Sequence, residues 1–243
     1  MGAGMTGPGP ASVDRDRTAL LCVPFAGAGA SFFHPWRELS AGRWRVVPVE
    51  LPGRERRLLE TPYRNVVDAA KNSVDDIVAD LGAGTRTVVF GHSLGAVLAY
   101  ELVQLLSTRD VRVERLVVSG SPGPWTQRER RATGLPDEEF LARVEEFAGF
   151  RHEALDHPEM RELILPVLQA DCEMHENYVP STDTPVSVPI RSLRGESDDL
   201  VTAAEARQWR DATTGGFSYV ELTGGHMYLA ERAREVLDLI ERA

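Results

Sequence analysis

The residues with the clearest chemical potential form the motif Gly91–Gly95, Gly-His-Ser-Leu-Gly, with Ser93 at its centre. An apolar run, Val88–Phe90, comes directly before the motif, and a helix-forming run, Ala96–Leu106, follows it. Gly-x-Ser-x-Gly between a strand and a helix is typical of a nucleophile elbow, a tight turn that exposes the serine hydroxyl. A Cβ atom at either glycine would crowd the backbone of such a turn. We therefore predict that Ser93 is a nucleophile rather than part of an ordinary turn.

A serine hydroxyl is a poor nucleophile at neutral pH unless a base takes its proton. Among the six histidines, we predict His226 as this base, because it follows Gly224-Gly225 directly after an expected strand. The chain order serine, acid, histidine is the one used with this kind of turn. His92 lies inside the elbow, where its side chain would point away from the path of the nucleophile. The other histidines show no metal-ligand spacing, so packing or surface roles and no metal site are expected for His34, His152, His157 and His175.

An acidic pair, Asp198 and Asp199, follows another expected strand and supplies a candidate to orient the base. Spacing alone cannot choose between adjacent residues. Asp198 has a valine three residues further on, in a Gly-x-x-Asp-x-x-Val arrangement that begins at Gly195. We predict Asp198 as the acid and keep Asp199 as the alternative; the other aspartate would be a solvated turn residue.

Attack on a carbonyl carbon creates an oxyanion, which two backbone N–H groups must stabilise. The residue after the nucleophile, Leu94, supplies one of them in a nucleophile elbow. The second is expected from the loop of small residues Pro24–Ala30, where the backbone can approach a substrate closely. We predict the N–H group of Ala26 as this donor, with Gly27 as the alternative.

Alternating strands and helices must position these residues. The expected strands are 19–23, 44–51, 88–91, 115–119, 190–194 and 217–222. Outside the insertion described below, the expected helices are one that follows Ser31 and includes Trp36 and Leu39, and those at 66–81, 96–106, 203–212 and 227–242. Continuous apolar strands that alternate with helices predict an α/β fold with a mostly parallel central sheet and helices on both faces. In such sheets, sites form beyond the carboxyl ends of the strands, where the predicted triad falls.

The alternation breaks between Ser121 and Pro189, where the helical patterns 137–147 and 158–177 follow one another without a strand. We predict an inserted helical lid over Ser93, at about residues 122–188. Met174 and the leucines near it could line an acyl pocket, although for any single residue packing within the lid is favoured.

The chain has 243 residues and a formal net charge of −10, which argues against a general nucleic-acid binder. Residues 1–17, rich in Gly and Pro, are expected to be a disordered leader before one domain at 18–243. Two cysteines, Cys22 and Cys172, are too few for a disulfide framework. No apolar stretch approaches the ~20 residues of a membrane span. A cytoplasmic protein without membrane contact is expected, and nothing requires more than a monomer.

Several motifs together resemble those of the type II thioesterases, discrete enzymes that accompany modular polyketide and nonribosomal peptide synthases. They are Pro24–Gly29, His34–Trp36, Leu51–Glu55, Gly91–Gly95 and Gly224–His226, within a resemblance that extends from about Ala19 to the C-terminus. The resemblance implies the α/β-hydrolase fold and hydrolysis of acyl groups from the phosphopantetheine arm of an acyl or peptidyl carrier protein. Such hydrolysis removes misloaded or decarboxylated acyl chains that stall the synthase, and its chemistry needs no cofactor or metal. Asp198-Asp199 stands where Asp-Pro is common, which keeps both aspartates open.

Carrier proteins are usually acidic, so a surface that docks one should be locally basic. Arg54, Arg56 and Arg57 follow the second expected strand near the site, and Arg128–Arg131 repeats the Arg-Glu-Arg-Arg pattern at the start of the lid. We predict that one of these clusters contacts the carrier or its phosphate; the alternative is solvated surface arginine.

Three other functions fit the same motifs. The first is a small-molecule carboxylesterase with the same triad and no carrier partner. The second is an acyltransferase or cyclase, in which an alcohol or amine resolves the acyl-enzyme. The third is a non-catalytic scaffold on a hydrolase fold, against which the intact Ser93, His226 and acidic pair argue.

Overall fold

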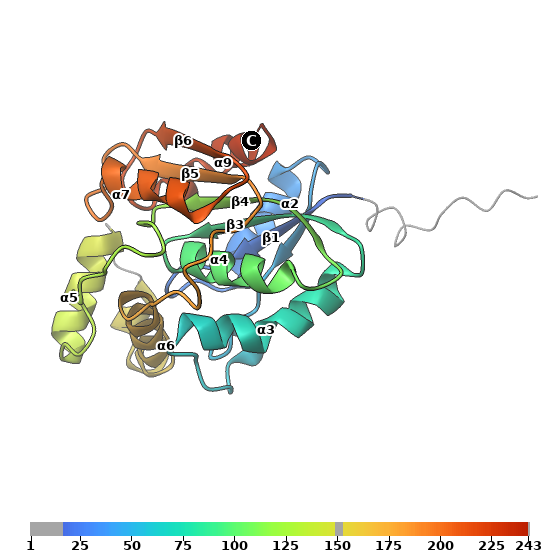
Figure 1. The fold of residues 1–243 in the computed structure, drawn as a ribbon. Helices are drawn as coiled ribbons and strands as arrows, with labels where there is room; N and C mark the ends of the chain where they lie inside the picture. The colour runs from blue at the N-terminus through green and yellow to red at the C-terminus, as the bar shows by residue number, and fades with distance from the viewer. Residues whose placement is uncertain (1–16, 149–152, 243) are drawn as a thin grey trace, which may run out of the picture.

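A single parallel sheet of six strands organises the molecule (Figure 1). The computed structural model describes residues 17–148 and 153–242, so the predicted leader lies outside the described residues except for Arg17. The strands are β1 (Ala19–Val23), β2 (Arg45–Pro48), β3 (Arg86–His92), β4 (Arg112–Ser119), β5 (Ile190–Gly195) and β6 (Phe217–Leu222). Their order is β2-β1-β3-β4-β5-β6, and every neighbouring pair is parallel. The α/β fold with a parallel sheet, predicted from the sequence, is confirmed.

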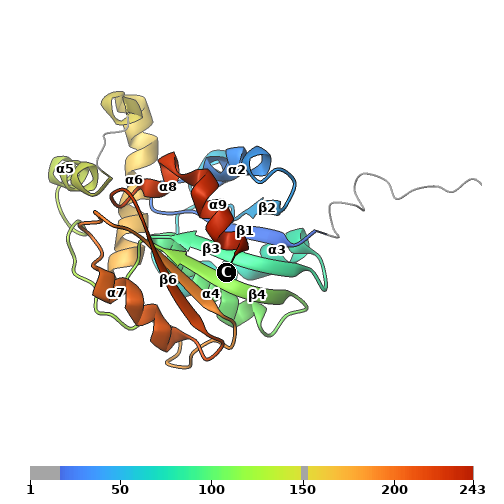
Figure 2. The same ribbon diagram turned by 90° about the horizontal axis from the view of Figure 1, so that it is seen from above.

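Helices cover both faces of this sheet (Figure 2). They are α2 (His34–Leu39), α3 (Val66–Leu81), α4 (Leu94–Leu106), α7 (Ala203–Arg207), α8 (Tyr228–Glu231) and α9 (Ala233–Glu241). Side chains alternate between two buried clusters along each strand, as the period of two requires. In β3, Val89 joins the cluster that contains α3 and α4, whereas Val88 and Phe90 join the cluster that contains α2 and α9. The central part of β3 is therefore continuously apolar because both of its faces are buried.

Helix α3 shows how local sequence sets these elements. The Asn65 side chain caps its first turn by accepting the N–H of Asp68 at 3.0 Å. Buried residues with helical spacing, among them Val74 and Leu81, face the sheet. The helix ends at Gly82, whose φ of 83° is costly for residues with a Cβ atom. The predicted bounds of this helix are those of the structure.

Two predicted helices differ from the structure. The helix expected at 203–212 is α7 followed by the 3-10 helix η4 (Gln208–Ala212). The helix expected at 227–242 breaks at Arg232 (φ −113°, ψ 29°) into α8 and α9. The two pieces have different anchors, since the Tyr228 hydroxyl in α8 bonds to Ser119 and Asp238 in α9 pairs with Arg43 at 2.9 Å.

The insertion between β4 and β5 contains α5 (Asp137–Ala148), η3 (Glu153–Asp156) and α6 (Pro158–Glu176). Figures 1 and 2 show α5 and α6 at one end of the sheet, in yellow tones. Phe140, Leu141, Leu155, Leu165 and Leu168 belong to a separate small core. Met174 does not: it lies 1% exposed in the main core, on the α4 side of the sheet. No helix in the described part of the chain is long and apolar enough to span a membrane.

Candidate active site

Ser93 occupies a strained turn between β3 and α4. Its φ of 53° and ψ of −119° are unusual for a residue with a side chain. The Ser93 N–H donates to the carbonyl of Ser119 at 2.8 Å, which ties the turn to the neighbouring strand. A Cβ atom at Gly91 would lie 2.0 Å from the carbonyl oxygen of Gly95, and one at Gly95 would lie 2.4 Å from that of Val23. Both glycines are therefore required by close backbone contacts.

His226 and Asp198 form a hydrogen-bonded pair at the same edge of the sheet. The Nδ1 atom of His226 lies 2.9 Å from Oδ2 of Asp198. The other carboxylate oxygen accepts the N–H groups of Leu200 at 2.9 Å and Val201 at 3.1 Å. The Asp198 side chain is completely buried, whereas Asp199 is exposed. Of the two aspartates, Asp198 is the one that bonds to the imidazole, so it stays the predicted acid.

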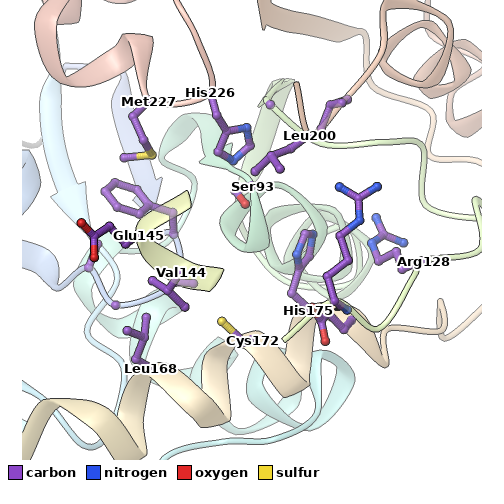
Figure 3. Close-up of a pocket in the computed structure, with 18 of the residues that line it drawn as sticks. Ser93, Arg128, Val144, Glu145, Leu168, Cys172, His175, Leu200, His226 and Met227 are labelled. Carbon is purple, nitrogen blue, oxygen red and sulfur yellow. Dashed lines mark hydrogen bonds between the residues drawn. The ribbon is translucent and has the colours of Figure 1, made fainter. Parts of the chain in front are cut away.

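With Nδ1 engaged, Nε2 is the ring nitrogen of His226 that remains for a nucleophile. Figure 3 shows His226 directly beside Ser93, with both side chains at the same cavity. Ser93 Oγ and His226 share no hydrogen bond among the described residues. Contacts of this kind are often long without substrate and tighten when one binds.

Arg194, which sequence reasoning missed, supports the loop that carries Asp198. Its side chain is almost fully buried, and it donates to the carbonyl oxygens of Val201 at 2.6 Å and Asp198 at 2.9 Å. It also pairs with Glu221 on β6 at 2.9 Å. The guanidinium therefore holds the backbone of Asp198 and of Val201. Its position inside a strand gave no signal for this role.

His92 lies behind the proposed base and is fully buried. Its ring centroid is 4.9 Å from that of His226. Its Nδ1 atom bonds to Ser119 Oγ at 2.8 Å, and Ser119 bonds in turn to the hydroxyl of Tyr228. Burial, and then the neighbouring His226, hold the pKa of His92 well below its ordinary value. A neutral His92 provides a fixed wall for His226 without adding positive charge beside it.

The two candidates for the second oxyanion donor differ in their hydrogen bonds. The Gly27 N–H donates to Asp171 Oδ2 at 2.8 Å and is therefore occupied. Ala26 lines the cavity together with Ser93. Leu94 is the first residue of α4, so its N–H has no partner within the helix. Ala26 and Leu94 thus stay the predicted donors, and the alternative, Gly27, is not available.

A buried ion pair holds the Ala26 loop against α6. The guanidinium of Arg54 binds Asp171 through two hydrogen bonds of 2.8 Å, and it donates to the carbonyl of Ala28 at 2.9 Å. The two side chains are 10% and 1% exposed. The next residue, Glu55, accepts the N–H groups of Ala30 and Ser31, both at 2.9 Å. The Leu51–Glu55 motif therefore positions the loop that would bind the oxyanion.

This arrangement corrects the prediction that Arg54 docks a carrier protein, since the side chain is buried and fully engaged. Arg56 pairs with Glu50 and is 82% exposed. Arg57 pairs with Glu60 at 2.6 Å and donates to the Glu50 carbonyl at 3.0 Å. Docking through Arg56 and Arg57 stays a prediction.

A cavity of about 640 Å³ opens beside Ser93 and His226. Its walls combine the first loop, the elbow and the lid (Figure 3). The lid contributes an apolar wall of Leu141, Val144, Leu155, Ile164 and Leu168. Leu141, Leu155 and Leu168 also belong to the core of the lid, so they both line the pocket and pack the lid. Met174, which was also considered for the pocket, is not part of the wall. The volume lies within the range of ordinary small-molecule sites.

Two polar residues of this cavity were assigned other roles from the sequence. His175, expected to have a packing or surface role, is a half-buried residue of the cavity wall. Arg128, placed in the second docking cluster, also lines the cavity rather than the outer surface. His152 lies outside the described residues. Sequence spacing carried no signal for these positions, because the path of the lid decides which of its side chains face inward. No group of histidine, cysteine or acidic residues suited to a metal ion occurs in the described ranges.

A serine at an elbow, an imidazole with a buried carboxylate partner and a neighbouring cavity are the arrangement typical of serine hydrolases with the α/β-hydrolase fold. The thioesterase domain family matches residues 18–243, so the chain belongs to this family.

Relatives and solved structures agree with this assignment. A probable cadicidin biosynthesis thioesterase of Streptomyces griseus is 33% identical over 95% of this chain, which spans 63% of that relative's length. The RedJ thioesterase from the prodiginine pathway of Streptomyces coelicolor superposes with a TM-score of 0.84 at 30% identity, covering 100% of this chain and 91% of RedJ. The type II thioesterase BorB, from the borrelidin biosynthetic cluster, gives a TM-score of 0.82 at 32% identity over 93% and 92% of the two chains.

The close contact at Gly91 leads to a stability prediction. Gly91→Ala places a Cβ atom against backbone that cannot move away without unfolding the elbow, so the free energy of unfolding should fall by more than about 3 kcal/mol. Gly84→Ala is the control, because this glycine has a positive φ of 70° and open space around it. It should lose only about 1 kcal/mol. Urea unfolding measures both, and equal losses would contradict the steric argument.

The buried ion pair leads to a second prediction. Arg54→Met leaves the Asp171 carboxylate buried without its cation, and the free energy of unfolding should fall by about 3 kcal/mol. Hydrolytic turnover should fall as well, since the Ala26 loop loses its anchor. Arg56→Met makes the same change at an exposed position two residues away and should leave both quantities nearly unchanged. Urea unfolding and steady-state kinetics of the two variants provide the comparison; similar behaviour would refute the structural role of Arg54.

Proposed function

We propose that this enzyme hydrolyses acyl groups from the phosphopantetheine arm of acyl or peptidyl carrier proteins. In this role it edits polyketide or nonribosomal peptide synthases that carry misloaded or stalled chains. The observation that carries the proposal is the Ser93–His226–Asp198 arrangement at a largely apolar, lid-covered cavity in a chain of the thioesterase family. The pathway names of its relatives support the same substrate class. Action as a cytoplasmic monomer is part of the proposal.

In the first half of the reaction, Ser93 Oγ attacks the thioester carbonyl carbon. His226 Nε2 takes the hydroxyl proton, and the hydrogen bond from Nδ1 to Asp198 stabilises the imidazolium that results. The carbonyl electrons move to the oxygen, which the N–H groups of Ala26 and Leu94 bind. When the carbonyl re-forms, the carbon–sulfur bond breaks and the pantetheine sulfur leaves. A thiolate leaves more readily than an amide nitrogen, so the carbon–sulfur bond can break before the sulfur is protonated. The proton on His226 then passes to the sulfur, which departs as the thiol and leaves His226 neutral for the second half.

In the second half, water attacks the acyl-Ser93 ester. His226 takes a proton from the water, the same oxyanion forms, and collapse returns the proton to Ser93 Oγ as the acid is released. The buried carboxylate of Asp198 keeps the imidazole in one orientation through both halves. Every step uses only the triad, the two backbone donors and water.

The direct test is mass spectrometry of a carrier protein loaded with a short acyl group, before and after incubation with the enzyme. The wild type should remove the acyl mass, and Ser93→Ala should leave it in place, because no other group can form the acyl-enzyme. Ser107→Ala, the same change at the far end of α4, is the control and should behave as wild type.

Other outcomes of this experiment favour the other functions. Cleavage of simple esters with a persistent acyl-carrier mass would indicate a carboxylesterase. Transfer of the acyl group to an added alcohol or amine would indicate an acyltransferase. Inertness toward both substrates, with no labelling of Ser93 by a fluorophosphonate probe, would indicate a non-catalytic scaffold.

The assignment of the acid is tested by neighbouring substitutions. Asp198→Asn removes the charge that stabilises the imidazolium and allows the wrong tautomer, so kcat should fall by about 10³- to 10⁴-fold. Asp199→Asn changes an exposed residue, and kcat should stay within about twofold of wild type. Steady-state hydrolysis of an acyl-pantetheine thioester measures both. A larger loss at residue 199 would reverse the assignment.

A further inference from the structure

The approach of His226 to Ser93 depends on what supports each residue from behind, because the two share no hydrogen bond among the described residues (Figure 3). The bond to Asp198 holds only the Nδ1 atom of His226. An imidazole held at one atom can still tilt, so a second support must aim Nε2 at the nucleophile. The ring of His92 supplies it, with its centroid 4.9 Å from that of His226 and the two planes 49° apart.

Gly120 supports both rings from the end of β4. Its φ is 54°, and a Cβ atom at this position would lie 2.5 Å from Cε1 of His92 and 3.2 Å from Cε1 of His226. Only a residue without a side chain leaves room for both imidazoles. The base is therefore packed against the ring of His92 and the backbone of Gly120.

Ser119, the residue before Gly120, connects these supports to the nucleophile. Its carbonyl oxygen accepts the N–H of Ser93 at 2.8 Å. Its hydroxyl bonds to Nδ1 of His92 at 2.8 Å and also to the hydroxyl of Tyr228. Ser119 is completely buried, so it contacts no substrate. One residue thus holds the nucleophile through its backbone and two supports of the base through its side chain.

The partners of the Ser119 hydroxyl have no substitute for it. The Nε2 atom of His92 is buried and unpartnered, so within the described ranges Ser119 is the one hydrogen-bond partner of this ring. Tyr228 begins α8 two residues after His226, and its side chain is buried as well. Its hydroxyl ties the chain that carries the base to β4. Water cannot replace these bonds in a dry interior, so their loss would loosen both supports.

We propose that Ser119 is a positioning residue that sets the approach of His226 to Ser93. This inference rests on the triad of the proposed function and is independent of which carrier delivers the acyl group. Ser119 acts through His92 and Tyr228, which hold the ring and the backbone of the base. Misplacement of a reacting group by about 1 Å can lower a rate about 10²-fold, so small movements of these supports affect turnover.

The test compares Ser119→Ala with Ser192→Ala in the whole enzyme. Ser192 lies on the neighbouring strand β5, is 1% exposed, and donates its hydroxyl to the carbonyl of Ala206 at 2.8 Å. Both variants lose a buried, hydrogen-bonded hydroxyl from the sheet, and urea unfolding should show a lower midpoint for each. Only Ser119→Ala should lower kcat for an acyl-pantetheine thioester, by about 10- to 100-fold. KM should stay within about twofold in both variants, because neither hydroxyl contacts substrate.

The rate at which a fluorophosphonate probe labels Ser93 gives a second measurement, because it reports activation of the nucleophile without an acyl chain. Ser119→Ala should slow labelling by a factor similar to the loss in kcat. Tyr228→Phe removes one of the two hydroxyl bonds, keeps the ring, and should lose less. The double variant should be no slower than Ser119→Ala, because the Tyr228 hydroxyl acts through Ser119.

The outcomes separate this inference from the proposed function. If the wild type is labelled but hydrolyses no thioester, the proposed function fails, and the labelling rates still decide the role of Ser119. Equal kcat values and labelling rates in Ser119→Ala and Ser192→Ala would refute the positioning role alone. Independent losses at Ser119 and Tyr228 would refute it too. Should Ser119→Ala fold poorly, Ser119→Cys keeps the shape with a weak hydrogen-bonding group. It should also be slower than wild type, and wild-type rates would overturn the proposal.

Discussion

The structure depends on one backbone constraint, the positive φ of Ser93 between β3 and α4. A residue with a side chain adopts this conformation only where its surroundings over-determine it. Here the N–H of Ser93 is fixed to β4, Gly91 lies against the carbonyl of Gly95, and Gly95 lies against the end of β1. Three neighbouring parallel strands therefore meet at the elbow. The parallel sheet is the means by which one strained residue is held at a common edge with the loops that carry Asp198 and His226.

A second constraint joins the oxyanion loop to the lid. Asp171 on α6 binds both Arg54 and the N–H of Gly27. Burying a charged pair costs solvation free energy that its mutual attraction offsets only with good geometry, so such a pair contributes more to a defined arrangement than to stability. In this protein it fixes the Ala26 loop, the Leu51–Glu55 motif and the lid helix relative to one another. The lid is consequently part of the framework of the site and not only a cover above it.

The sequence predicted what depends on local pattern. Continuous apolar runs located the strands, helical spacing located most helices, and the strand-end positions of Ser93 and His226 followed from the parallel fold. The choice between Asp198 and Asp199 needed the structure, since only burial and a hydrogen bond separate adjacent carboxylates. Arg54 was predicted to lie at the surface, because the sequence pattern of a basic run is the same whether all of its side chains are exposed or one of them is buried. The inward direction of Arg128 and His175 depends on how the insertion folds back, which has no local sequence signature.

The sheet and the insertion have different roles, and these roles follow from the positions of their residues. The elbow, the base and the acid belong to loops at the carboxyl edge of the sheet, and the hydrogen bonds of the Asp198 carboxylate do not involve the insertion. The insertion supplies the apolar side of the cavity, and it also supplies Arg128 and His175 on the other side. Changes in the insertion can therefore alter which acyl group fits while the reacting atoms keep their geometry. The limit on such changes is Asp171, because this lid residue also holds the loop that would bind the oxyanion. Different residues therefore select the substrate and catalyse the reaction, and Asp171 connects the two sets.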